Sequence, residues 1–270
     1  MALLYPGLTP TREARMRGPP RIFDRKLYSQ RRARASGTDF LVKDAAAHMC
    51  ERIRALKPVA QAALDLSSRP EAFAELESCA VNWTRTSSHK GLQLCADEES
   101  LPFGPHSFDL VTSVFGLHAV NDLPGALIQI RKILKPGGLL VAVMFGGETL
   151  RELRDSFAAA ESELSGGASP RVSPFADVRD LGALLQRAGF AGPVADVERT
   201  VVRYSRFESL LRDLRELGET NVLQQRSRKF LRRDVLAAML SHYTHAHADT
   251  DEKLRATFDV IYLTGLAPTN

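Results

Sequence analysis

The feature that most constrains this chain is an alternation of apolar runs and amphipathic segments between Ala62 and Phe145. The runs "AALDL", "SFDLVTSVFGLH" and "GLLVAVMF" predict buried strands. The stretches "PEAFAELE" and "DLPGALIQIRKIL" have helical spacing, with Pro70 in a first turn, Asp122 as N-cap and "KPGG" as a stop. This alternation requires right-handed crossovers and predicts a doubly wound α/β fold, with helices on both faces of a parallel sheet.

Further elements extend this pattern in both directions. Four more runs predict strands: "CAVNW", "LQLCA", "VADVERTVVRY" and "ATFDVIYLTGLAP". Residues 40–56 and four later stretches predict helices: "ETLRELRDSFAAAESEL", "DVRDLGALLQRAGF", "RFESLLRDLRELGE" and "RRDVLAAMLSHYTHA". We therefore predict a seven-stranded, mostly parallel sheet in one domain, residues 38–270. Insertions at about 149–190 and 205–247 are expected to form a helical cap over the carboxyl edge of the sheet.

Residues 1–37 predict a separate basic arm. It carries Arg12, Arg15, Arg17, Arg21, Arg25, Lys26, Arg31, Arg32 and Arg34 against only Glu13 and Asp24. Such an arm can contact RNA, an acidic protein or anionic lipid, and it also has the composition of an organellar transit peptide. The alternative is a solvated tail. No secretory signal is recognised, and no apolar run approaches the roughly 18 residues that span a bilayer.

Composition agrees with a globular chain. Hydrophobic residues make up 44% and charged residues 25%, and the net charge is +4. Cys50, Cys79 and Cys95 form no CxxC pair, which predicts reduced thiols in a reducing compartment.

The segment from Ala96 to Arg154, with "LPF…SFDLV", "LHAVNDLP", "LKPGG" and "MFGGETLRELR", resembles the class I S-adenosylmethionine-dependent methyltransferase superfamily. The stretches "IFDRKL", "SPFADVRDLGALLQRAGF" and "LRDLRELGETN" extend a narrower resemblance over most of the chain from Ile22. That resemblance is to the group that includes the mitochondrial complex I assembly factor described as an arginine hydroxylase. The malonyl-carrier-protein methyltransferase of biotin synthesis is a more distant relative.

The resemblance implies a Rossmann-like fold with S-adenosylmethionine over the carboxyl ends of the first strands. It also implies a protein partner, a respiratory complex I subunit, in the mitochondrial matrix or a bacterial cytoplasm. In the superfamily a glycine-rich turn follows strand one, an acidic residue ends strand two and an Asp follows strand three. Asp65 begins the corresponding turn here, and Asp97 with Glu98 fits the third contact.

The remaining cofactor contacts differ from the superfamily pattern. Ser67, Arg69 and Glu71 occupy the glycine positions, and the second-strand region has no carboxylate, with Asn82 or Thr84 near the expected place. Glycine admits positive φ angles and close approach of a ligand, and other residues cost about 1–2 kcal/mol in the left-handed region. Either the cofactor pocket is degenerate, or the cofactor binds in a shifted pose through Asp65, Asp97 and backbone groups.

Candidate cofactor-binding residues are Asp65, Ser67, Asp97, Glu98 and His118. His118 follows a central strand, where it can serve acid–base chemistry or substrate binding, or can simply pack. His242 and His245 share a helix face, but no second ligand cluster is recognisable, so no metal site is predicted. No catalytic residue is assigned.

Two functions remain open from the sequence. In the first, the chain is a pseudoenzyme of the assembly-factor group that acts by binding proteins. In the second, it is an S-adenosylmethionine-dependent enzyme, a methyltransferase or an arginine hydroxylase, that modifies a protein partner.

Overall fold

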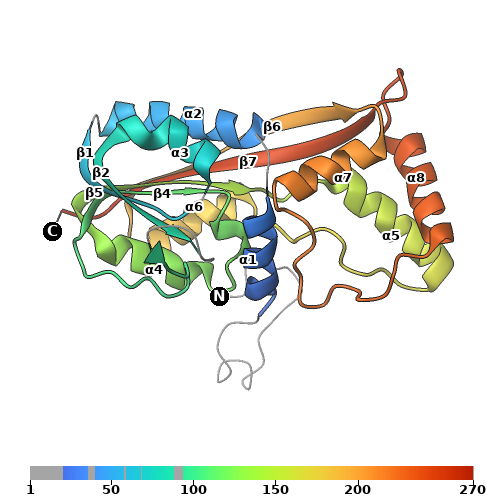
Figure 1. The fold of residues 1–270 in the computed structure, drawn as a ribbon, viewed down its shortest axis with the longest axis horizontal. Coiled ribbons are helices and arrows are strands. Elements are labelled where there is room, and N and C mark those ends of the chain that lie inside the picture. Colours follow the sequence, from blue (N-terminus) through green and yellow to red (C-terminus); the bar gives the residue numbers. More distant parts are fainter. Residues whose placement is uncertain (1–20, 36–39, 58, 68, 88–93, 270) are drawn as a thin grey trace.

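A computed structural model of the chain describes residues 21–35, 40–57, 59–67, 69–87 and 94–269. Across these residues seven strands form one sheet in the order β3-β2-β1-β4-β5-β7-β6 (Figure 1). The strands are β1 (Ala60–Asp65), β2 (Ala80–Ser87), β3 (Leu94–Cys95), β4 (Phe108–Val114), β5 (Leu134–Phe145), β6 (Ala191–Tyr204) and β7 (Leu254–Leu266). Strand β7 runs antiparallel to β5 and β6, and the other neighbouring strands of this sheet are parallel. The predicted seven-stranded, mostly parallel sheet is confirmed.

Helices cover both faces of the sheet, as predicted. The helices are α1 (Arg25–Arg34), α2 (Phe40–Leu56), α3 (Pro70–Leu76), α4 (Leu123–Ile133), α5 (Arg151–Ser165), α6 (Val178–Arg187), α7 (Phe207–Glu216) and α8 (Arg233–His247), with short 3-10 turns at Glu77–Cys79 and Leu117–Ala119. Apolar side chains of α2 and α3 pack into one core, and those of α4 and α6 into a second core on the opposite face (Figure 1).

Strand β5 shows why both faces are covered. Its residues Val141 and Val143 point into the first core, whereas Leu140 and Ala142 point into the second. All four are fully buried. A strand buried on both faces reads as a continuous apolar run, which is how this strand was recognisable in the sequence.

The end of α4 differs slightly from prediction. Asp122 caps the helix as expected, because its Oδ1 accepts a hydrogen bond from the Gly125 N–H at 3.0 Å. The helix ends at Ile133, however, before "KPGG", which lies inside β5. Gly137 has a φ of 69° there, a left-handed conformation that glycine adopts without strain.

The predicted cap requires a correction. Helices α5 and α8 pack against each other, and with α7 they lie beyond the carboxyl ends of β1 and β4, against the end of the antiparallel β6–β7 pair (Figure 1). Helix α6, which belongs to the first predicted insertion, packs instead on β6 and β7. Its buried Leu181, Leu184 and Leu185 belong to the second core. The burial of this apolar face therefore places α6 against that face of the sheet.

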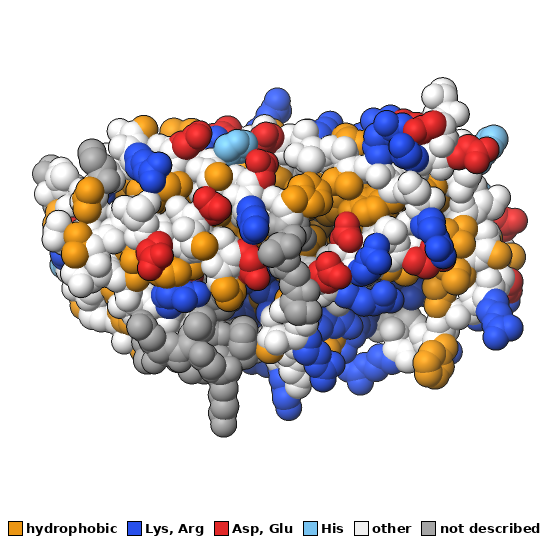
Figure 2. All heavy atoms as spheres, turned by 45° about the horizontal axis from the view of Figure 1, so that its top comes forward, with side chains coloured by type: hydrophobic (Ala, Val, Ile, Leu, Met, Phe, Trp, Pro, Cys, Tyr) orange, Lys and Arg blue, Asp and Glu red, His pale blue; other side chains and the backbone are white. Residues whose placement is uncertain are grey.

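The predicted basic arm also requires a correction. Residues 1–20 lie outside the described residues, but α1 is built into the fold beside the carboxyl ends of the strands (Figure 1). Phe23 and Tyr28 are buried with Val222 and Leu223 in a third apolar cluster. The burial of these two aromatic side chains fixes a segment whose many arginines indicated a solvated arm. Lys and Arg side chains gather in the lower central part of the face in Figure 2.

The thiols of Cys50 and Cys79 give a first testable prediction. Both are buried and free, with their Sγ atoms 3.1 Å apart, and burial raises the pKa of Cys79 to about 12. Since the thiolate is the reactive form, Cys79 should resist alkylation at pH 8 in the folded protein and react once urea unfolds it. Mass-spectrometric mapping of iodoacetamide adducts measures this. Rapid modification of Cys79 before unfolding would contradict the prediction.

Within the described ranges, no helix combines the length and apolar character that crossing a bilayer requires.

Candidate functional site at the carboxyl edge of the sheet

The sheet order defines a crevice between β1 and β4. The chain continues from β1 to β2 and β3 on one side, and β4 lies on the other, so this is a topological switch point. Ligands of open α/β sheets bind at the carboxyl ends of the strands at such a point. Here the crevice is bounded by the residues after Asp65 and those after Val114.

Asp65 and Ser67 form the first wall of this crevice. The Asp65 Oδ1 accepts hydrogen bonds from the Ser67 N–H at 3.0 Å and from the Ser67 hydroxyl. Both side chains are buried. Burial raises the pKa of Asp65, although the hydrogen bonds from Ser67 oppose this effect. The turn that lacks glycines is thus closed by a local contact between these two predicted site residues.

Phe115 forms the opposite wall. The predicted strand "SFDLVTSVFGLH" ends early, at Val114, because Phe115 has a φ of 50°. Non-glycine residues rarely adopt this left-handed conformation, and its persistence indicates that surrounding contacts hold it. The Phe115 carbonyl accepts hydrogen bonds from the Tyr28 hydroxyl at 3.0 Å and from Arg32 Nη1 at 3.1 Å.

Arg32 spans the crevice. Its Nη2 donates to the Ser67 carbonyl at 2.7 Å, while its Nη1 donates to the Phe115 carbonyl on the other wall. The Arg32 side chain is only 6% exposed. Helix α1 therefore places a guanidinium across the ends of β1 and β4, where a ligand of this fold would lie.

Glu219, in the loop after α7, gathers three further groups. Its Oε1 accepts from Arg69 Nη2 at 3.0 Å and lies 3.4 Å from Arg32 Nη1, and its Oε2 lies 2.9 Å from His118 Nε2. Arg69 also donates to the Leu217 carbonyl at 3.1 Å. The arginine in a glycine position therefore serves an internal ion pair.

Arg25 joins the remaining predicted residues. Its Nη2 lies 3.0 Å from Asp97 Oδ1 and also pairs with Glu98, and its Nη1 donates to the Ala119 carbonyl at 3.1 Å. Glu98 is buried, whereas the Asp97 side chain is 47% exposed. Burial raises the pKa of Glu98, and Arg25 opposes that shift.

Charges in this cluster balance. Among the described residues, the cations Arg25, Arg32 and Arg69 contact the anions Asp97, Glu98 and Glu219. Burial lowers the pKa of Arg32, but Tyr28 and Glu219 raise it more, so the guanidinium stays protonated. The five predicted site residues thus lie at one edge of the sheet, and α1 connects them.

Strand β2 contains no carboxylate and carries one cation, Arg85, near its end. Strand β2 continues to Ser87, beyond the predicted "CAVNW", so Asn82 and Thr84 lie before its carboxyl end. Arg85 is paired in register with Asp65, its Nε lies 3.9 Å from Asp65 Oδ2, and its guanidinium lies 4.0 Å from the centre of the Phe73 ring. Arg85 is therefore an internal cation near Asp65, although its Nε and Nη2 have no hydrogen-bond partner in the described structure.

The functional side chains that sequence reasoning missed are Arg25, Arg32 and Glu219. Arg25 lies in "IFDRKL" and Glu219 in "LRDLRELGETN", two stretches that carry the narrower resemblance. Because both stretches carry the narrower resemblance, the sequence contained a signal that these two residues belong to one site. Arg32 had no such signal, because it belongs to a run of arginines typical of a solvated segment.

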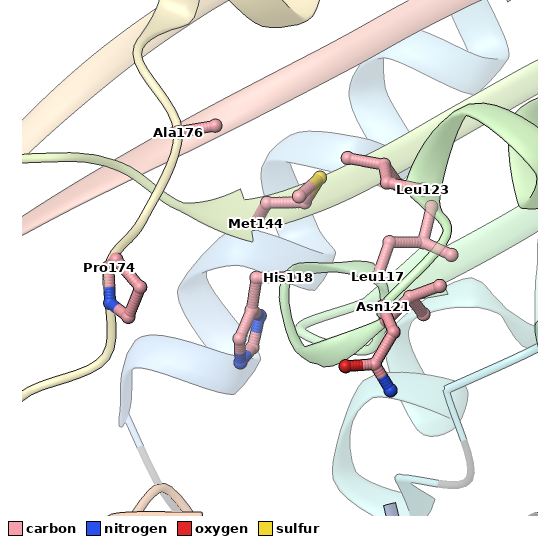
Figure 3. A pocket seen from close by; sticks show the side chains of 8 residues that line it. Leu117, His118, Asn121, Leu123, Met144, Pro174 and Ala176 are labelled. Carbon is pink, nitrogen blue, oxygen red and sulfur yellow. The ribbon is translucent and has the colours of Figure 1, made fainter. Parts of the chain in front are cut away.

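His118 also faces a small cavity beside the main crevice (Figure 3). The cavity has a volume of about 20 Å³, room for one water molecule, and Met144 and Pro174 help to line it. His118 Nδ1 is buried without a hydrogen-bond partner in the described structure. His118 therefore packs between an ion pair and a water-sized space, which suits a structural role.

Potential metal ligands lie elsewhere. His242 Nε2 lies 3.5 Å from Glu163 at an exposed position on α8. Asp44, His48 and Glu198 bring ligand atoms within 4.8 Å of one another, with His48 half-buried and both carboxylates exposed. Exposed groups of this kind are common without an ion, and we assign no metal to them.

Comparison with known proteins identifies the family. Residues 36–142 match the family described as "Methyltransferase domain". The protein named "Arginine-hydroxylase NDUFAF5, mitochondrial" of Danio rerio is 34% identical over 92% of this chain and 83% of its own length. This chain belongs to the NDUFAF5 family. The human protein of the same name is 36% identical over 90% of this chain and 76% of its own length.

Two more distant comparisons concern the fold. The malonyl-[acyl-carrier protein] O-methyltransferase of Gallionella capsiferriformans is 34% identical over 63% of this chain and 56% of its own length. The crystal structure of the YcgJ protein from Bacillus subtilis has a TM-score of 0.57 at 13% identity, covering 83% of this chain and 99% of that one. The class I methyltransferase fold is thereby shown.

The residues present do not fit S-adenosylmethionine in the superfamily's usual pose. Arg32 occupies the crevice between the two walls, and β2 offers no carboxylate for the ribose hydroxyls. The cofactor is a sulfonium cation, which would add positive charge to a cluster whose three arginines are already balanced by carboxylates. We therefore derive no chemical step through this cofactor.

Proposed function

We propose that this member of the NDUFAF5 family is a protein-binding component that acts without S-adenosylmethionine bound in the superfamily's usual pose. The observation that carries the proposal is the guanidinium of Arg32, which bridges the Ser67 and Phe115 carbonyls across the crevice. For the cofactor to enter, α1 would have to release this contact and leave Glu219 and Glu98 without part of their buried charge partners.

The energetic balance supports this proposal. Leaving one partner of a buried ion pair uncompensated costs about 3–5 kcal/mol. A cofactor that binds with micromolar affinity supplies about 8 kcal/mol in total, so displacement would consume a large part of it. In the described part of the turn after β1, the Ser67 N–H already binds Asp65 and does not compensate this loss.

The family relationship suggests the kind of partner. Relatives of this chain are named for action on arginine, and the resemblance of the sequence to assembly factors implies a subunit of respiratory complex I as the partner. We extend the assembly-factor role to this chain, in the mitochondrial matrix or a bacterial cytoplasm. Both compartments are compatible with free Cys50 and Cys79.

Isothermal titration of the full chain with S-adenosylmethionine tests the proposal. We expect no binding tighter than about 100 μM, a threshold of about 5.5 kcal/mol. A thermal-shift measurement should agree, because a ligand that binds only the folded state raises its stability in proportion to the logarithm of its concentration.

Tighter binding would overturn the proposal and favour the alternative, an S-adenosylmethionine-dependent enzyme. Mass spectrometry of an arginine-containing peptide incubated with the chain and the cofactor would then distinguish the two reactions. Addition of a methyl group indicates a methyltransferase, and addition of one oxygen indicates a hydroxylase.

A further inference from the structure

A larger cavity lies outside the crevice, between α5 and three loops. Its walls are α5, the loop after it, the residues just before α1 and the loop after α7. The cavity volume is about 650 Å³. Ligand sites in proteins commonly occupy about 300–1,000 Å³, so this cavity is large enough for several side chains of a bound segment.

One part of the cavity wall is apolar. Phe157 and Ala158 contribute from α5, Val172 from the loop after it, and Leu223 from the loop after α7. Phe157 and Leu223 are also anchored in apolar clusters of the protein. Because their other sides are packed, these side chains present a fixed surface to a ligand.

The charged part of the wall is positive. Arg21, Arg154 and Arg171 line the cavity, and no Asp or Glu is among the lining residues that the structure describes. Arg171 is neutralised by buried Glu161, whose Oε1 lies 2.8 Å from Arg171 Nε. Arg154 Nη2 donates to the carbonyls of Gly147 and Thr149, each at 3.1 Å.

Two of these arginines keep an uncompensated charge. In the part of the chain that the structure describes, neither Arg21 nor Arg154 has a carboxylate within 4.0 Å. Hydrogen bonds to backbone carbonyls hold Arg154 in place without cancelling its charge. The cavity therefore repels a guanidinium or ammonium ligand and attracts a carboxylate, which arginine binds through bidentate hydrogen bonds.

The loop that supplies Leu223 and Gln225 to the cavity is itself positively charged. It continues to α8 as "QQRSRKFLR", residues 224–232, in which Arg228 and Lys229 are exposed and Phe230 is fully exposed. A small free carboxylate would use only the cavity. A longer acidic segment would also use this loop, with its cations and its aromatic side chain.

We propose that this cavity and the adjoining loop bind an acidic segment of a partner protein that also carries apolar side chains. Carboxylates of the segment pair with Arg21 and Arg154, and an apolar side chain lies on Phe157 and Leu223. This assignment rests on the proposed protein-binding function and adds the chemistry of the partner. Arg32 is not among the described residues that line this cavity.

Fluorescence anisotropy with three fluorescein-labelled peptides tests this assignment on the full chain. The peptides, of about eight residues each, alternate Leu with Glu, Gln or Lys. We expect the Glu–Leu peptide to bind at least about tenfold more tightly than the other two, and to bind less tightly as salt is raised. Ala158→Glu and Arg21→Glu, at exposed lining positions, should each weaken it about tenfold through like-charge repulsion.

Arg187→Glu is the matched control, since Arg187 is exposed on α6 and does not line the cavity. It should change the affinity by less than about twofold. Equal binding of all three peptides, or an equal loss in the control, would overturn the assignment. So would binding to vesicles of equal parts phosphatidylcholine and phosphatidylserine without binding of the Glu–Leu peptide. The S-adenosylmethionine titration reports on the crevice alone, so failure here leaves the proposed function separately testable.

Discussion

Replacing Glu219 with Ala is expected to lower the free energy of unfolding by about 3–5 kcal/mol. The side chain of Glu219 contacts Arg32, Arg69 and His118 at distances between 2.9 and 3.4 Å. Its loss leaves two guanidinium groups buried, because the Arg32 and Arg69 side chains are only 6% and 7% exposed. Urea unfolding followed by circular dichroism measures the change.

Two further variants show whether the charge cluster is the cause. Glu216→Ala removes an exposed carboxylate at the end of α7 and should change the free energy of unfolding by no more than about 0.5 kcal/mol. Replacing Glu219, Arg32 and Arg69 together with Leu, Leu and Met should recover much of the lost stability, since apolar side chains can substitute for a buried ionic cluster. A loss below about 1 kcal/mol for Glu219→Ala, as for a surface pair, would show that water reaches these groups in solution.

The interactions of this charge cluster could not be predicted from the sequence. The central strands were predictable because an apolar run buried on both faces leaves a local pattern, as the alternation of Leu140 and Val141 between two cores illustrates. The contacts of Glu219 leave no local pattern. It pairs with Arg69 and Arg32 from positions 150 and 187 residues away in the chain.

For individual side chains at the crevice, the sequence predicted the location but not the interaction partner. Asp65, Asp97 and Glu98 lie at the carboxyl edge, where the superfamily pattern puts them. Arg69 was recognised as a misplaced cation, but its partner in the loop after α7 was not. The end of β2 was misplaced because the polar residues after Trp83 continue the strand without the apolar alternation that would reveal it.

Helix α1 was not predicted, because its charged composition indicated a solvated segment and its apolar residues were too few to indicate a helix. The segment "RKLYSQRRAR" has one buried side chain, Tyr28, and four arginines. A single aromatic anchor gives no helical periodicity, and the charges indicate a solvated arm. The arginines of this segment point into the fold because they pair with carboxylates at the edge of the sheet, such as the buried Glu98.

Tyr28→Ala should therefore release α1 while the sheet stays folded. The Tyr28 ring is 3% exposed, packs edge-on to the His118 ring at 6.3 Å and lies beneath the guanidinium groups of Arg25 and Arg32. Truncating a buried aromatic side chain costs about 3–5 kcal/mol. Hydrogen exchange should show that amides of α1 lose protection by roughly a hundredfold or more, which corresponds to about 3 kcal/mol.

Two matched variants distinguish the packing of the Tyr28 ring from the hydrogen bond of its hydroxyl and from a change in helix propensity. Tyr28→Phe removes only the hydrogen bond to the Phe115 carbonyl and should cost about 0.5–1.5 kcal/mol. Gln30→Ala, at an exposed position of α1, should leave protection unchanged. If Tyr28→Ala exposed amides of β4 and β5 as much as those of α1, the helix would be part of the global folding unit. Selective release would instead show that α1 is a separately docked element, and that the crevice of this methyltransferase fold is closed by the chain's own arginines.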